Sequence, residues 1–201
     1  MNARLRRSGV LFFVVILLLS QGEAWSAALQ ETPQTPPPPY LTVGAVEGSP
    51  GASLIVPLYY AADQQTPVRS FTLEIEFVSN NLEFQDASKG IVDQESLEIS
   101  SSLTKGTPDS KGVTRSKLRL TAKLADENEK QGLGEGLLAY LMFQLSLEAK
   151  PFVIMLTPTV ISAEDTEKPA RKVAKLGALP GSISVLSLDV TPEMSCFFFT
   201  H

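Results

Sequence analysis

Apolar and polar residues alternate with a period of two along much of this chain. The alternation is strictest in residues 71–77 (FTLEIEF) and 117–124 (KLRLTAKL). Successive side chains of a β-strand point to opposite faces of the sheet, so each segment predicts a strand with one buried and one solvated face. No segment shows a convincing amphipathic-helix period of 3.6 residues. The pattern therefore predicts an all-β fold.

The remaining strands are predicted from shorter apolar segments. Residues 137–147 are apolar on both phases, which predicts a central strand with Phe143 and Leu147 on its cleaner apolar face. Pro57 is predicted to mark an edge strand or a bulge, and Pro158 to separate two strands. The shorter predicted strands are 41–45, 54–60, 82–84, 97–103, 152–156, 160–163 and 183–185.

The number and spacing of these strands indicate the fold class. About nine short strands, separated by turns rich in Gly, Pro and Asn, are typical of a β-sandwich. Residues 40–186 are long enough for one sandwich with a single core, and the sequence shows no internal repeat. We therefore predict a single all-β domain, a jelly-roll sandwich.

Residues 1–28 have the organisation of a secretory signal peptide. Three arginines precede an apolar run at 10–19, and small residues follow at 26–28. The alternative is a membrane anchor, but the run is shorter than the roughly 20 residues that a membrane-spanning helix needs. The sequence therefore predicts a secreted or other extracytoplasmic protein, cleaved after Ser26 or Ala28, with no transmembrane segment in the mature chain.

Two further segments flank the predicted domain. Residues 29–39 contain the run ETPQTPPPP, which is typical of a stiff polyproline II linker. Residues 187–201 form a short tail with an apolar segment around Cys196. Three roles stay open for this tail: packing on the sandwich, contact with a partner, and a remnant of a lost module. Cys196 is either a free thiol or one half of an intermolecular disulfide.

Composition disfavours most catalytic chemistry. The 201 residues include one histidine, His201, and one cysteine, Cys196. One chain therefore holds no intramolecular disulfide and no His/Cys zinc site, and a catalytic histidine on the last residue would be hard to position. The formal net charge of −5, without a basic cluster beyond the first residues, is unfavourable for nucleic-acid binding. We expect a binding protein without enzymatic activity, metal or cofactor.

Several segments carry a resemblance to one known family. Residues 43–58 (VGAVEGSPGASLIVPL) are similar to that family's opening strand, Gly-x-Pro-Gly turn and following strand, and residues 136–147 (GLLAYLMFQLSL) to its Gly-x-Leu-Ala-x-Leu-x-Phe strand. Residues 71–90, 118–126 and 160–185 resemble its other strands and turns. The chain resembles the cohesin domain, the receptor module of cellulosome scaffoldins. The resemblance implies a jelly-roll sandwich that docks a protein partner in extracellular polysaccharide binding or breakdown.

The resemblance also implies where a partner would bind. In cohesins the strands that match Arg69–Phe77 and Thr114–Leu124 belong to the docking sheet. The partner-binding residues implied here are Ser70, Thr72, Glu74, Lys117 and Arg119. This set mixes both signs of charge with short hydroxyls, which suits specific and salt-sensitive recognition. Near Ser70 and Thr72 the family commonly has an Asn/Asp pair that this chain lacks. The resemblance implies a protein partner, either a dockerin-like module or an envelope protein.

The same charged residues allow other interpretations. Glu74 and Glu76 share a strand face at a separation of roughly 7 Å, which is geometrically possible for a glycosidase pair, but the favoured interpretation is a solvated strand face. Lys117, Arg119 and Lys123 form a basic stripe that either binds a partner or pairs with the neighbouring glutamates. The acidic loop 126–129 is either a calcium site or a solvated turn.

Two alternative functions stay open for the domain. A carbohydrate-binding sandwich would bind polysaccharide through a coplanar strip of aromatic rings. Tyr59 and Tyr60 are adjacent on one strand, so they are expected on opposite faces and do not form such a strip. The second alternative is a structural, immunoglobulin-like envelope or adhesion domain.

Overall fold

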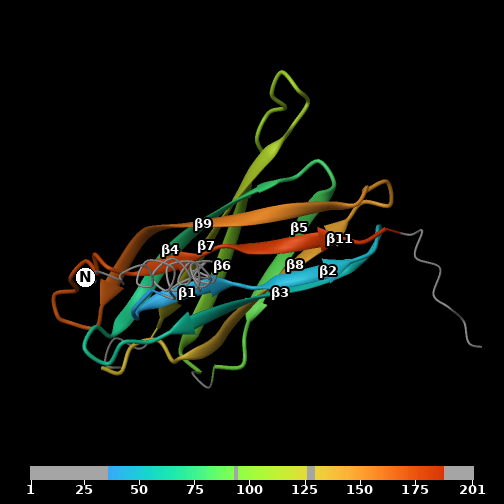
Figure 1. Ribbon diagram of the computed structural model, residues 1–201. Coiled ribbons are helices and arrows are strands. Elements are labelled where there is room, and N and C mark those ends of the chain that lie inside the picture. The colour runs from blue at the N-terminus through green and yellow to red at the C-terminus, as the bar shows by residue number, and fades with distance from the viewer. Residues whose placement is uncertain (1–35, 93–94, 126–129, 188–201) are drawn as a thin grey trace, which may run out of the picture. The chain divides into compact units, whose positions relative to one another are not determined.

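A computed structural model describes residues 36–92, 95–125 and 130–187. None of these residues is helical, and their strands form two sheets packed face to face (Figure 1). The predicted all-β sandwich is confirmed. Its strands are β1 (Tyr40–Val43), β2 (Ala45–Gly48), β3 (Ser53–Ala61), β4 (Val68–Val78), β5 (Leu82–Lys89), β6 (Leu97–Thr104), β7 (Arg115–Leu124), β8 (Gly136–Leu145), β9 (Phe152–Asp165), β10 (Gly177–Leu179) and β11 (Gly181–Val185).

The strands divide into a small and a large sheet. The small sheet has the order β10-β1-β3-β8-β5, and the large sheet has the order β2-β11-β9-β4-β7-β6. Neighbouring strands are antiparallel except for β1 with β10 and β2 with β11, which are parallel. Each sheet therefore contains one parallel pair, formed by a strand from the start of the domain and a strand from its end.

The described ranges contain eleven strands where about nine were predicted: the first predicted strand is divided between the two sheets as β1 and β2, and β10 was not predicted. β1 passes to β2 at Gly44, whose amide donates to the Pro57 carbonyl at 2.8 Å. A Cβ built at Gly44 would lie 2.6 Å from Cγ of Pro57, so this close approach requires glycine. β10 passes to β11 at Pro180 in the same manner.

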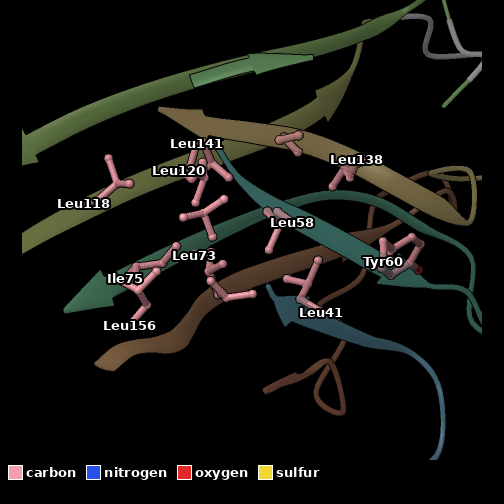
Figure 2. Packing of buried hydrophobic residues seen from close by; sticks show 14 of the residues in the cluster. Leu41, Leu58, Tyr60, Leu73, Ile75, Leu118, Leu120, Leu138, Leu141 and Leu156 are labelled. Carbon is pink, nitrogen blue, oxygen red and sulfur yellow. The ribbon is translucent and has the colours of Figure 1, made fainter. Parts of the chain in front are cut away.

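The core forms between the inner faces of the two sheets. The apolar phase of β4 is almost fully buried, as the alternation predicted, and so is that of β7. Figure 2 shows Leu73 and Ile75 of β4 among leucines of the surrounding strands. Phe143 of β8 is 1% exposed and meets the rings of Phe77 and Phe84 edge-on, with centroids 5.4 and 5.5 Å away. β8 lies between β3 and β5, so its predicted central position is confirmed.

Of the two alternatives predicted for Pro57, the structure has the bulge: β3 is an inner strand between β1 and β8, and its register shifts between Leu58 and Tyr59. Two other details of the predicted strands are wrong. β9 continues through Pro158, because β11 pairs with β9 only as far as Leu156, which leaves the proline with a neighbouring strand on one side. Leu147 lies beyond the end of β8 and is 83% exposed.

Several predictions fall on residues outside the described ranges. These are the signal peptide, the linker as far as Thr35, the acidic loop 126–129, and the tail from residue 188, with Cys196 and His201. In the part of the chain that is described, no helix is long and apolar enough to cross a membrane.

Candidate binding face

The candidate face is the outer surface of the large sheet over β9, β4, β7 and β6, which we call the polar face. The register of β4 against β7 sets Thr72 opposite Thr121 and Glu74 opposite Arg119. It sets Ser70 opposite Lys123 and Glu76 opposite Lys117. The structure thus places all five residues that the resemblance implies, Ser70, Thr72, Glu74, Lys117 and Arg119, on one outward surface.

An ion-pair cluster occupies the centre of the polar face. Nζ of Lys117 donates to Oε1 of Glu74 at 2.8 Å, and Nη2 of Arg119 donates to Oε2 at 3.4 Å. Nη1 of Arg115 lies 3.8 Å from Oε1 of Glu76. The Glu74 side chain is 18% exposed and the two cations that it binds are more than half exposed. Exposed pairs of this kind contribute little to stability, so the cluster is better suited to orienting charge than to holding the fold.

The cluster shifts the ionisation of its members. The hydrogen bond from Lys117 is the main cause that lowers the pKa of Glu74; burial opposes it, and Arg119 adds to the lowering. The hydrogen bond to Glu74 likewise raises the pKa of Lys117. A glycosidase acid needs a carboxyl whose pKa is raised, in a cleft facing a second carboxyl. Glu74 has the opposite shift and lies on an outer face, so the structure favours the solvated, charge-paired interpretation.

Hydroxyl groups surround the ion-pair cluster. Thr72 and Thr121 place their Oγ1 atoms 3.3 Å apart, and Oγ of Ser70 lies 3.5 Å from Oε2 of Glu164, to which it donates. The neighbouring strands add hydroxyls that the sequence reasoning did not single out: Ser100, Ser102 and Thr104 on β6, and Thr157, Thr159 and Ser162 on β9. Alternate serines and threonines in 100–104 and 157–159 are the signal for them, but only the strand register brings them beside β4 and β7.

Apolar side chains border the polar face on its β9 side. Val153 and Met155 are about half exposed, as is Ile161 at the bulge of β9. They give the surface a hydrophobic margin beside a hydroxyl-rich centre.

The outer face of the small sheet carries the exposed aromatic residues. Tyr59 is 45% exposed whereas Tyr60 is buried, so their predicted separation to opposite faces is confirmed. Ile55 of β3 is 58% exposed and lies opposite Met142, while Tyr140 lies opposite Pro57. Tyr59 and Tyr140 thus share one face across two strands. Tyr140 is partly buried, so this face lacks the broad row of open rings that sugar stacking uses.

Within the described ranges, no group of three or more acidic, histidine or cysteine side chains is arranged to hold a metal ion. The acidic loop considered for calcium lies outside those ranges.

Comparison with known proteins places the fold. The sequence matches no protein-family model and no curated relative. The seventh ScaB type I cohesin from Pseudobacteroides cellulosolvens is similar in structure, with 16% identity and a TM-score of 0.58 over 81% of this chain and 97% of that one. The sixth scaffoldin B cohesin from Acetivibrio cellulolyticus, solved with a Cel5 dockerin mutant, has 17% identity and a TM-score of 0.55 over 75% and 100%.

An archaeal structure extends the comparison. A non-cellulosomal cohesin from Archaeoglobus fulgidus has 21% identity and a TM-score of 0.50, over 74% of this chain and 91% of that one. At such low sequence identities the structural similarity shows the fold alone. All three alignments span nearly the whole length of the compared domains. The chain therefore has the cohesin fold.

Proposed function

We propose that this chain with a cohesin fold is an exported, non-catalytic module that docks a protein partner through its polar face. The observation that carries the proposal is the convergence of Ser70, Thr72, Glu74, Lys117 and Arg119 on one outward surface. Those residues belong to the strands that match the docking sheet of cohesins, and the Acetivibrio cohesin was solved with a dockerin bound.

The chemistry of the face supports docking on physical grounds. Ser and Thr hydroxyls both donate and accept hydrogen bonds, so the hydroxyls of the polar face can pair with either donors or acceptors of a partner. The Glu74 cluster presents both signs of charge, which sets the orientation of a partner with the complementary pattern and makes association sensitive to salt. A stable complex buries about 1,200–2,000 Å² in total.

The partner that this face fits is a dockerin-like module or an envelope protein. Ser70 and Thr72 stand near the positions where cohesins commonly have an Asn/Asp pair, and short hydroxyls reach less far than amides and carboxylates. A partner must therefore approach this part of the sheet closely. The signal-peptide organisation of residues 1–28 supports export, and the resemblance supports a context of extracellular polysaccharide binding or breakdown.

The proposal is tested by capture from the secretome of the host. The mature chain is used as bait, a captured protein is identified by mass spectrometry, and its affinity is measured with the purified partner. We expect Glu74→Lys combined with Arg119→Glu to weaken binding at least tenfold at low ionic strength, because the partner's charge pattern no longer matches. Circular dichroism checks that the variant is folded.

A matched control lies on the opposite sheet. Tyr59→Ser changes an exposed residue of the small sheet and is expected to leave the partner affinity unchanged. Unchanged affinity of the double variant, or loss of binding in the Tyr59 variant alone, would count against docking on the polar face. Binding of polysaccharide that depends on Tyr59 would favour the carbohydrate-binding alternative.

A further inference from the structure

Among the described strands, β6 is at the edge of the large sheet and hydrogen-bonds only to β7. The amide of Ala125 donates to the carbonyl of Ser96 at 2.8 Å, and the ladder continues without a register shift to Thr104 opposite Lys117. In an antiparallel ladder, alternate residues hydrogen-bond to the neighbour. The even-numbered residues of β6 therefore bond to β7. The odd-numbered residues point their N–H and C=O groups at the open edge: Leu97, Ile99, Ser101 and Leu103.

The other sheet edges in the described ranges are protected, and β6 is not. β5 carries charged residues along its length and a bulge between Phe84 and Asp86, while β2 has four residues and β10 has three. β6 has eight residues, no proline, no bulge, and Glu98 as its single charge. A long and nearly uncharged edge of this kind templates the addition of another strand.

A cleft whose lining mixes polar and apolar residues lies beside the open edge. It has a volume of about 710 Å³, and its lining includes Leu103 of β6, Phe77 of β4 and Phe84 of β5. Lys105 and Glu83 lie across it with Nζ and Oε1 4.0 Å apart. Leu103 and Ile99 are only partly buried on the same inner side of β6. Apolar surface on this side of the strand is therefore left to be covered from the edge.

We propose that β6 pairs antiparallel with β6 of a second copy of this chain, which joins two large sheets into one continuous sheet. A two-fold axis at Ser101 sets Ile99 opposite Leu103 of the second copy, and Ser100 opposite its Ser102. Glu98 then lies opposite Thr104, so no like charges meet. In this register the residues that would exchange hydrogen bonds between the two copies are all odd-numbered. These are the residues whose backbone N–H and C=O groups point away from β7.

The self-complementarity of this register is what favours a second copy over an unrelated strand. Ile99 and Leu103 pair with each other twice, once on each side of the axis. Ile99 of the second copy faces inward and lies beside Leu103, on the side of the strand where the cleft is. Each copy thereby covers apolar surface of the other. The inference does not depend on the proposed docking function, because it uses the edge of the sheet and not its outer face.

The test is the oligomeric state of the mature chain, measured by sedimentation equilibrium over a concentration series. We expect a reversible dimer. Ser101→Pro removes an edge-facing N–H, and Ser101→Lys brings two positive charges together at the axis; each is expected to raise the dimer dissociation constant at least tenfold. Ser101→Ala is the matched control and is expected to leave the dimer intact. Two different disrupting variants keep the test valid if one of them fails to fold.

A second measurement locates the axis. Ser101→Cys in a Cys196→Ser background is expected to form a disulfide-linked dimer on mild oxidation, because residues opposite each other in such a pair lie about 5.5 Å apart at Cα, within disulfide range. A wild-type chain that stays monomeric, a dimer that survives both disrupting variants, or pairing only with a strand of another protein would overturn the proposal. Retention of partner binding by the monomeric Ser101→Lys variant separates this result from the docking proposal.

Discussion

The Glu74 carboxylate lies closer to Lys117, at 2.8 Å, than to Arg119, at 3.4 Å, although Arg119 is its direct cross-strand neighbour. Lys117 is itself opposite Glu76, which in turn lies 3.8 Å from Arg115. Both glutamates thus reach a cation two residues away in the partner strand. Diagonal pairing of this kind is within reach of long side chains in twisted antiparallel strands. It produces two neighbouring ion-paired groups on the polar face, one around Glu74 and one at Glu76, and Glu76 also attracts Lys117.

The lowered pKa of Glu74 predicts a pH dependence of stability. A carboxyl whose pKa is lower in the folded state stabilises the fold above its unfolded pKa, and that contribution is lost as the pH falls through the folded value. We expect wild type to melt above Glu74→Gln at neutral pH, with the difference narrowing only below the pKa of a free glutamate, about 4.3. Thermal melts across a pH series measure this. A difference that disappears well above that pKa would contradict it.

The position of Phe143 predicts a large effect on the core. Its ring is 1% exposed between Phe77 and Phe84, so Phe143→Ala should cost about 3–5 kcal/mol in the free energy of unfolding. Glu76→Ala is the comparison, since that side chain is 42% exposed, and should change stability by no more than about 0.5 kcal/mol. Equilibrium denaturation in urea measures both. Equal losses would show that the assignment of the β4 and β8 faces is wrong.

The passage from β1 to β2 predicts a site that tolerates no side chain. A Cβ at Gly44 meets the stiff ring of Pro57, so Gly44→Ala should destabilise the domain by about 1–3 kcal/mol. At Gly177 the closest atom would be 3.4 Å away, an ordinary contact, so Gly177→Ala should be nearly neutral. Chemical denaturation of both variants measures their free energies of unfolding. A larger loss for the Gly44 variant would show that the passage between β1 and β2 tolerates a side chain less well than the pairing of β10 with β1.

The organisation of residues 1–28 predicts export and cleavage. Amino-terminal sequencing of the protein purified from its host should begin at Ala27 or Leu29, since small residues precede both positions. An intact Met1 on a cytoplasmic protein would contradict this prediction.

Strand positions and the core followed from local periodicity, because the alternation in 71–77 and 117–124 depends only on which face is buried. The changes of sheet at Gly44 and Pro180 did not, because they depend on contacts with strands far along the chain. For the same reason Pro158 was misread: whether a proline breaks a strand depends on whether a neighbour needs its missing N–H.

The candidate face shows the same division. Outward placement of Glu74 and Lys117 was predictable from each strand alone, and pairing of the basic stripe with the glutamates was one of two interpretations that stayed open until the register was known. The hydroxyls of β6 and β9 were not singled out, because only the register carries Ser102 and Thr159 beside Arg119 and Glu74. Long-range pairing of strands is information that a one-dimensional pattern does not contain.

The parallel pairing of the first and last strands has a mechanical consequence. β2 runs beside β11 from Ala45 opposite Ser182 to Gly48 opposite Val185, and β1 runs beside β10 in the same sense. The chain therefore enters the domain at Tyr40 and leaves it at Val185, and these two residues lie at opposite ends of the parallel terminal strands. Tension that draws these two points apart loads the terminal ladders in shear, so that their hydrogen bonds share the force and must yield together, whereas an antiparallel terminal pair would peel open one bond at a time.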